Sequence, residues 1–121
     1  MHKQTPLNGR LAACPLRRIM DIVGAKWTLA ILPLLKQRAM RNGELKKELQ
    51  GVSQRVLTET LRHLERDGLV LREERDGFPR YVEYRLTPLG VSLANAFQEL
   101  NRWVEAHEGE IEAARARTMG K

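Results

Sequence analysis

The sequence has few of the residues that catalytic and metal sites need. Among its 121 residues Cys14 is the only cysteine, which excludes a disulfide within one chain and any metal site built from cysteine pairs. The three histidines, His2, His63 and His107, are far apart in the chain. There is no glycine-rich phosphate loop and no His/Cys/Asp/Glu cluster with metal-ligand spacing. We therefore expect no enzymatic activity, no metal and no cofactor.

Long apolar runs are also missing. The longest, Leu29 to Leu35, has seven residues and contains a proline, whereas a membrane-spanning helix takes about 20. The first ten residues lack the apolar stretch and cleavage site of a secretory signal. We therefore expect a cytoplasmic protein that does not enter a membrane.

What the chain does have is positive charge. Its 21 Lys and Arg against 15 Asp and Glu give a net charge of +6, which favours a polyanionic partner, with nucleic acid first and an anionic membrane surface second. The length suits one domain over residues 1–121. We expect residues 14–112 to be ordered and the tails, 1–13 and 113–121, to be frayed.

Apolar periodicity predicts helices through the first half of the chain. They are expected over residues 15–24, 25–37, 42–49 and 53–67. Asn42 and Ser53 are the expected N-caps, and Pro33 is expected to kink the second helix. The helices are expected to end at Gly24, Gly51 and Gly68.

The second half changes period. Residues 69–74 and 81–86 are strand-like, with Asp76-Gly77 as a hairpin turn signal, and a long helix capped by Thr87-Pro88 follows. This order predicts a mainly α fold with a small β-hairpin wing (α+β), which is a winged helix-turn-helix with N- and C-terminal dimerisation helices.

The helix over 53–67 has the composition of a DNA recognition helix. Its leucines fall on one face, so its arginines fall on the other, and a helix of this kind fits the major groove. Residues near its start are expected to reach base edges, and Arg62 and Arg66 to meet phosphates. The alternative is a solvated face in which Arg55, Glu59 and Arg62 only form salt bridges. The DNA-binding candidates here are Ser53, Gln54, Arg55, Thr58, Arg62 and Arg66.

Three further basic residues are candidates for DNA backbone contacts. Arg75 and Arg80 flank the hairpin tip, which could lie against the sugar-phosphate backbone or enter the minor groove. The alternative is turn chemistry with charges that keep a strand edge soluble. Lys46, on the preceding helix, is a weaker candidate for a phosphate contact.

Four stretches of the chain together resemble the HxlR-type family of winged helix-turn-helix regulators, a bacterial, MarR-like family. The resemblance covers about residues 14 to 108, and residues 51–62 and 82–90 are its most distinctive parts. Two departures are that Asn42 and Gly43 follow Arg41 where family members have an Arg-Phe pair, and that Pro33 interrupts a helix. The stretches are Cys14-Pro15, Gly24-Ala25-Lys26-Trp27-Thr28, residues 51–62 (GVSQRVLTETLR) and residues 82–90 (VEYRLTPLG).

The resemblance implies a homodimeric transcriptional regulator that binds a palindromic operator, with its terminal helices packed across a two-fold axis. Half-sites are then about 34 Å apart. The apolar stripe of the last helix supports a dimer, since it is wider than one short helix needs; the alternative is packing within one subunit. The interface candidates are Leu89, Leu93, Phe97, Leu100, Trp103 and Val104.

The inducing signal is open between several alternatives. In several members of the family a cysteine matching Cys14 senses oxidants or electrophiles, while a free cysteine is also commonly only a small buried hydrophobe. A small-molecule effector could instead bind between the long helix and the winged domain. The remaining alternative is a winged-helix protein-interaction module that does not bind DNA.

Overall fold

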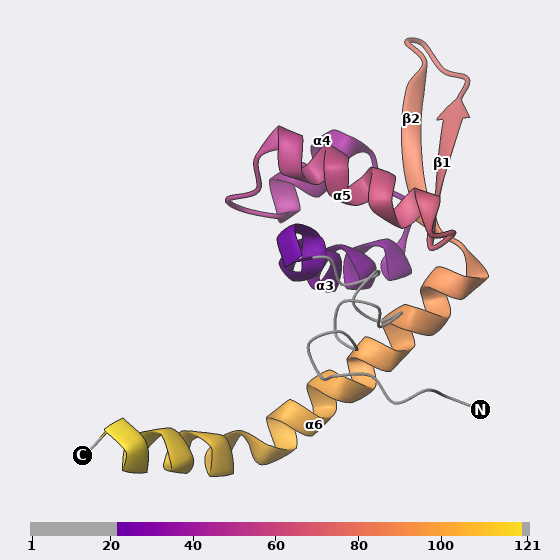
Figure 1. Cartoon of the computed structure of the whole chain (residues 1–121). Coiled ribbons are helices and arrows are strands. Elements are labelled where there is room, and N and C mark those ends of the chain that lie inside the picture. Colours follow the sequence, from indigo (N-terminus) through magenta and orange to yellow (C-terminus); the bar gives the residue numbers. More distant parts are fainter. Residues whose placement is uncertain (1–21, 120–121) are drawn as a thin grey trace, which may run out of the picture.

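The computed structural model describes the backbone of residues 22–119 and the side chains of residues 26–119. Most of the expected first helix, and Cys14 with it, lies outside the described residues. The elements follow one another in the predicted order, four helices and one hairpin over this part of the chain (Figure 1). They are α3 (Ile22–Gln37), α4 (Asn42–Glu48), α5 (Gln54–Arg66), β1 (Val70–Arg75), β2 (Tyr81–Leu86) and α6 (Pro88–Met119).

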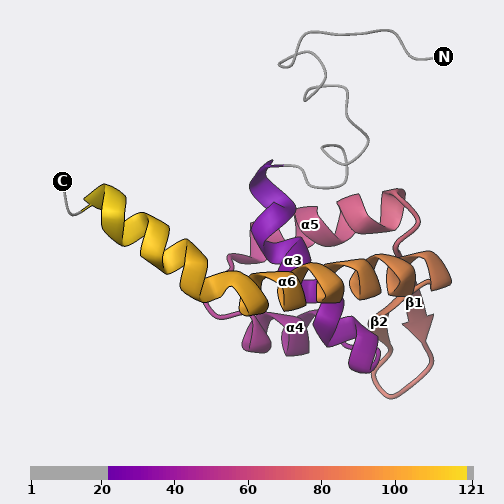
Figure 2. The ribbon, with the colours of Figure 1, turned by 90° about the horizontal axis from the view of Figure 1, so that it is seen from below.

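The core forms around α3, which packs against α5 on one side and α6 on the other. Ile31 and Leu32 of α3 have no exposed surface, and the leucine face of α5 meets them. Leu69, Val70 and Leu86 close the core at the base of the hairpin. In the view from below, α6 crosses under α3 (Figure 2). The expected mainly α fold with a two-stranded antiparallel hairpin is confirmed.

The turn between α4 and α5 forms as the sequence predicted. Gly51 has φ +91°, a left-handed conformation that glycine adopts without steric cost. Ser53 caps α5, because its Oγ accepts a hydrogen bond of 3.1 Å from the Val56 amide. Gly68, at φ +77°, ends the helix on the other side.

Two predicted helix boundaries are wrong. Gly24 does not end a helix but lies inside α3, where one internal glycine costs only about 1 kcal/mol. The N-cap of α4 is Arg41 rather than Asn42, because Glu44 lies three residues after Arg41 and its Oε1 accepts the Arg41 amide at 2.8 Å. This hydrogen bond is the main reason that the pKa of Glu44 is below its ordinary value.

The hairpin is longer at its tip than a two-residue turn. Arg75 pairs with Tyr81, so the connecting loop has the five residues 76–80 instead of a turn at Asp76-Gly77 alone. Proline at position 79 has no amide to donate and so cannot extend the ladder. Met40 and Tyr84 exchange two backbone hydrogen bonds, of 2.9 and 2.8 Å, which attach β2 to the segment between α3 and α4.

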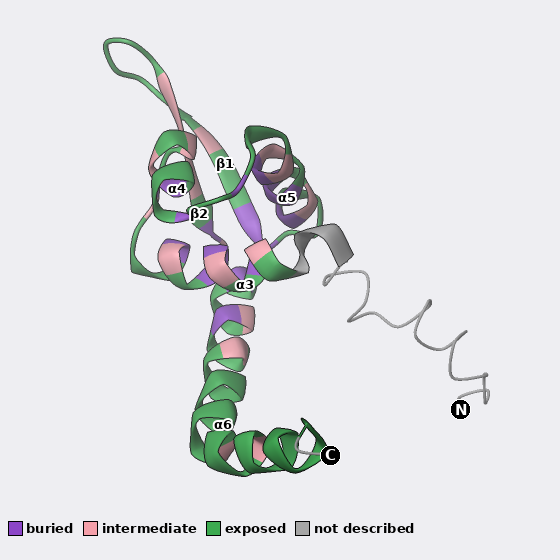
Figure 3. Cartoon of the chain, turned by 90° about the vertical axis from the view of Figure 1, so that its left-hand side faces the viewer, coloured by how far each residue is buried: buried purple, intermediate pink, exposed green. Residues whose placement is uncertain are grey.

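Helix α6 leaves the body in the direction opposite to the hairpin (Figures 1 and 3). Thr87 caps it as expected: its Oγ1 accepts the Gly90 amide at 3.0 Å and donates to the Gly68 carbonyl at 2.6 Å. The helix continues to Met119, beyond the predicted end of order at residue 112, because residues 110–117 are alanines, glutamates, arginines and one isoleucine, mostly strong helix formers. No helix in the described part of the chain is long and apolar enough to cross a membrane.

Candidate nucleic-acid interface

The solvent-facing side of α5 carries the arginines that the spacing predicted. Leu57, Leu61 and Leu64 are at most 1% exposed, which holds the helix by its inner face. The outer face is polar throughout, and Ser53 and Gln54 are exposed at its start. The exposed arginines on this helix are Arg55, Arg62 and Arg66.

Two side-chain pairs organise the first turns of this face. Gln54 Nε2 donates to Thr58 Oγ1 at 3.1 Å, and Arg55 Nη1 lies 3.4 Å from Glu59 Oε1. The Arg55 side chain is 81% exposed, so this ion pair is worth little in free energy and can be exchanged for another acceptor. The alternative interpretation, in which Arg55, Glu59 and Arg62 only form salt bridges, holds in part. Arg55 pairs with Glu59, whereas Arg62 forms no ion pair with the residues described.

The other basic residues predicted to contact DNA lie on α4 and on the hairpin, the elements beside α5 (Figure 1). Lys46 is exposed in the last turn of α4. Arg80 is exposed at the hairpin loop, with its Nε 3.9 Å from Asp76 Oδ1 and 79% of its side chain in solvent.

Arg75 differs from Arg80, although their positions beside the hairpin loop predict equal roles. Its Nη2 lies 2.9 Å from Glu73 Oε1 and its Nε 3.2 Å from Glu83 Oε1. Arg85 binds both oxygens of Glu73 from the opposite strand, at 2.9 and 3.2 Å. This hydrogen bonding from Arg85, with the charge of Arg75, holds the pKa of Glu73 below its ordinary value. The same hydrogen bond and the charge of Glu73 raise the pKa of Arg85. The charge of Arg75 is therefore already balanced within the hairpin.

Two features of the hairpin were not predicted. Phe78 is fully exposed at the tip, with a relative exposure of 107%. The guanidinium of Arg41 stacks over the Tyr81 ring, 3.8 Å from its centroid. The apolar residue inside an otherwise charged turn was the available sequence signal for Phe78, whereas no sequence pattern pairs Arg41 with Tyr81.

The apolar stripe of α6 divides into two parts. Leu93 and Phe97 are half-buried and pack against the core. The other interface candidates are exposed, and Figure 3 shows this length of α6 mostly in green. Trp103 also stacks on His107, with ring centroids 4.4 Å apart. The exposed members are Leu89 at 58%, Leu100 at 56%, Trp103 at 52% and Val104 at 40%.

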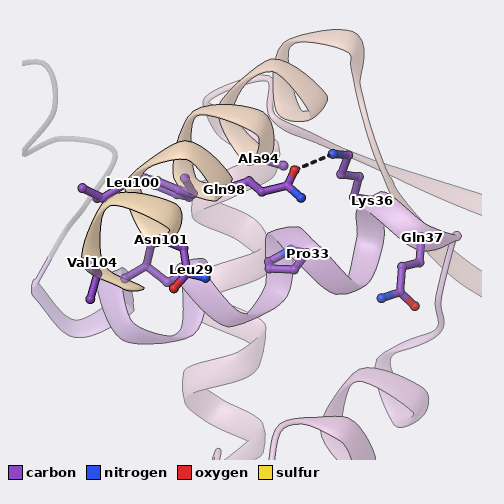
Figure 4. A pocket seen from close by; sticks show the side chains of 10 residues that line it. Leu29, Pro33, Lys36, Gln37, Ala94, Gln98, Leu100, Asn101 and Val104 are labelled. Atoms are coloured by element: carbon purple, nitrogen blue, oxygen red, sulfur yellow. Dashed lines mark hydrogen bonds between the residues drawn. The ribbon is translucent and has the colours of Figure 1, made fainter. Parts of the chain in front are cut away.

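A groove of about 730 Å³ lies between α3 and α6 (Figure 4). Leu29, Pro33 and Val104 are among its apolar lining residues. Its polar end carries Lys36, whose Nζ donates to Gln98 Oε1 at 3.0 Å. Within the described part of the chain, no group of three or more His, Cys, Asp or Glu could hold a metal ion.

A helix-turn-helix with a basic outer face, followed by a β-hairpin beside it, defines the winged helix-turn-helix proteins, a class that includes many DNA-binding regulators. Comparison with family models gives the narrower assignment: residues 22–112 match the HxlR-like helix-turn-helix model. The chain belongs to this family.

Known proteins agree with this assignment. The HTH-type transcriptional regulator YtfH of Escherichia coli is 34% identical over 102 residues, which are 84% of this chain and 81% of YtfH. A structure from Enterococcus faecalis, described as a transcriptional regulator of the MarR family, superposes with a TM-score of 0.70 at 36% identity, covering 93% of this chain and 97% of that one. The redox regulator HypR, in its reduced form, gives a TM-score of 0.70 at 31% identity, covering 82% and 98%.

Proposed function

We propose that this protein binds a palindromic DNA operator as a homodimer and thereby regulates transcription, acting in the cytoplasm and without a catalytic step. The observation that carries the proposal is the outer face of α5, where three exposed arginines stand on a helix held by buried leucines. A helix of this size and charge fits the major groove. Membership of a helix-turn-helix family supports it.

Each candidate residue has a distinct role in this proposal. Gln54, Arg55 and Thr58, in the first turns of α5, read base edges, and Ser53 fixes the start of the helix. Arg62, Arg66, Lys46 and Arg80 contact phosphates. Arg75 supports the hairpin through Glu73 and Glu83 instead of meeting DNA.

The dimer forms through α6, on which Leu89, Leu100, Trp103 and Val104 are exposed. An exposed apolar face of this length is unusual on a monomer. Because α6 and the hairpin leave the body in opposite directions (Figure 1), a dimer formed through α6 leaves both α5 helices free to face one duplex. The half-sites are then about 34 Å apart, one turn of DNA.

The test is selection of bound duplexes from a random pool, followed by affinity measurements on the selected operator and on random DNA. Arg55→Ala is expected to lower operator affinity more than non-specific affinity, whereas Arg62→Ala lowers both alike. Operator preference left intact in Arg55→Ala would refute the base-reading role. A protein-interaction module would bind no duplex at moderate salt, whereas a DNA binder loses affinity with a log-log salt slope near −0.9 per phosphate.

The groove between α3 and α6 favours a small-molecule effector as one inducing signal. It combines an apolar lining with the ammonium group of Lys36, which suits an apolar organic acid. A screen of such acids by thermal shift, with Lys36→Gln as the comparison, tests this. Equal shifts for both proteins would exclude Lys36 as the anchor.

An oxidant response at Cys14 is the other proposed signal, supported by the likeness to the redox regulator HypR. Cys14 lies outside the described residues. Diamide or a quinone is expected to change the operator affinity of the wild-type protein and not that of Cys14→Ala. Equal responses in both proteins would remove Cys14 from the mechanism.

A further inference from the structure

The tip of the hairpin presents one aromatic side chain to solvent. Phe78 has a relative exposure of 107%, so its ring is not packed against the protein. Its neighbours in the loop, residues 76, 77, 79 and 80, are also exposed and comprise two charged residues, a glycine and a proline. A single exposed apolar residue is common, so the exposure of Phe78 needs further observations before it indicates a partner.

The first of these observations is that residues on the two sides of Phe78 lie close to one another. A Cβ atom on Gly77 would lie 3.1 Å from the Tyr81 ring and 3.2 Å from the Pro79 carbonyl oxygen, so the two ends of the loop are in close contact. The start of β2, next to the loop, is in contact with Arg41, the N-cap of α4, whose guanidinium lies over the same Tyr81 ring. The loop therefore holds a defined position relative to α4, with Phe78 directed outward.

The second observation concerns charge. Arg75 and Arg85 are balanced by Glu73 and Glu83 within the hairpin. Arg80 is 79% exposed, and its contact with the fully exposed Asp76 carboxylate is long, at 3.9 Å. The cation that the tip offers to a partner is thus Arg80. It stands two residues from Phe78, so the tip presents a guanidinium and an aromatic ring together.

We propose that Phe78 is a minor-groove wedge, which enters the groove beside each half-site at a flexible pyrimidine–purine step while Arg80 lies along the same groove. An apolar wedge with a nearby arginine is a combination that minor-groove proteins use, and pyrimidine–purine steps unstack most easily. The hairpin rises on the side of the molecule away from α6, the side that α5 also occupies (Figure 1). This inference rests on the proposed DNA binding by α5 and adds a second contact to it.

The experiment uses the full chain and the operator selected from the random pool. Hydroxyl-radical footprints of the wild type and of Phe78→Ala first locate the flank that the wing protects. 2-Aminopurine, whose fluorescence rises when it unstacks, then replaces each adenine of that flank. Phe78→Leu keeps an apolar wedge, and Leu71→Ala is the control, because Leu71 is an exposed apolar residue on β1 paired with Arg85, away from the tip.

We expect the wild type and Phe78→Leu to raise the fluorescence at one step in each flank. Phe78→Ala leaves the 2-aminopurine fluorescence quenched at saturating protein. It binds the operator roughly tenfold more weakly, because the free energy lost with the burial of one aromatic ring exceeds the cost of unstacking that is saved. Leu71→Ala behaves as the wild type. Because the Phe78 side chain is fully exposed, the thermal unfolding of Phe78→Ala should match that of the wild type.

DNA binding by α5 and the wedge are refuted by different outcomes. If the wild type binds no duplex at moderate salt, the proposed function fails and the wedge with it. If the wild type binds its operator but the fluorescence stays quenched at every flanking position, or if Phe78→Ala binds as tightly as the wild type, the wedge is wrong and DNA binding by α5 stands.

Discussion

At the scale of single residues, the contacts of two arginines separate roles that their positions in the sequence make look alike. Arg75 and Arg80 both flank the hairpin loop, yet Arg75 lies within 3.2 Å of two carboxylates while Arg80 has one contact at 3.9 Å. A cation already paired within the protein releases few counterions from DNA. We therefore expect Arg75 to contribute less to DNA binding than Arg80, although their positions in the sequence predict equal contributions.

Arg80→Ala is expected to weaken binding to operator and random DNA alike and to reduce the log-log salt slope by about 1. Arg75→Ala should leave that slope unchanged, because it removes a charge that the hairpin had neutralised. The measurement is duplex affinity by fluorescence anisotropy over a range of salt concentrations. An equal loss of slope in both variants would show that Arg75 leaves its carboxylates when DNA binds.

The ion pairs of Glu73 also predict how stability depends on pH. Its pKa in the folded protein is below the ordinary 4.5, chiefly because Arg85 donates to it. The resulting stabilisation is present above the unfolded pKa and is lost as the pH falls through the folded value. Glu73→Gln should therefore lose less stability than the wild type between about pH 5 and pH 3, as measured by urea unfolding.

Glu74→Gln is the control for this experiment, since Glu74 is the next residue and its contact with Arg72 is longer, at 3.8 Å. It should keep the acid sensitivity of the wild type. Parallel curves for the wild type and Glu73→Gln would contradict the assignment of that sensitivity to Glu73.

At the scale of elements, the hairpin and α6 are in close contact at Gly90. A Cβ atom on Gly90 would lie 2.0 Å from the Leu69 carbonyl oxygen, which is backbone and cannot turn away. Gly90→Ala is therefore expected to lower the free energy of unfolding by about 3 kcal/mol, measured by urea denaturation.

Gly43→Ala provides the matched comparison. Gly43 also lies in a helix, α4, but no other described residue stands within 4 Å of its Cβ position. The same substitution should raise stability by about 0.5 kcal/mol, because alanine loses less conformational freedom on helix formation. A similar loss of stability in both variants would mean that packing against Leu69 is not the cause.

These elements also indicate how far the sequence predicts the structure. Helices and strands follow from the spacing of buried residues, and turns follow from Ser53, Gly51 and Gly68, because these signals are local. The misplaced boundaries depend on partners. Arg41 becomes the cap of α4 only because Glu44 reaches back to its amide, and the pairing of Arg75 depends on Glu83 across the strand register. Periodicity does not encode contacts of this kind.

The candidate site was predictable to the same extent. Helical spacing alone indicates which arginines of α5 face solvent, because the leucines are buried at fixed intervals. The division of the α6 stripe was not predictable, since Leu93 and Leu100 lie two turns apart on one face, yet only Leu93 packs against the core. Phe78 was missed because an apolar residue in a charged turn has no periodic pattern to mark it.

At the scale of the whole molecule, the basic surface and the exposed apolar surface lie on different elements. The hairpin, α4 and α5 lie on one side of α3, and α6 extends away on the other (Figure 3). Exposed arginines and lysines lie on the first three elements, and exposed apolar residues, Trp103 among them, lie on α6. Dimer formation and DNA binding should therefore be separable by substitution.

Trp103→Ser is expected to shift the protein from dimer to monomer in sedimentation velocity, because an aromatic ring half exposed on one subunit would be buried in the dimer. Operator affinity should fall because the two recognition helices are no longer linked, while affinity for a duplex holding one half-site stays the same. Arg102→Ser is the control, since Arg102 is the adjacent residue, is exposed and pairs with Glu99 on its own helix. A dimer that persists in Trp103→Ser, with operator affinity unchanged, would show that the exposed half of the α6 stripe does not join the two subunits.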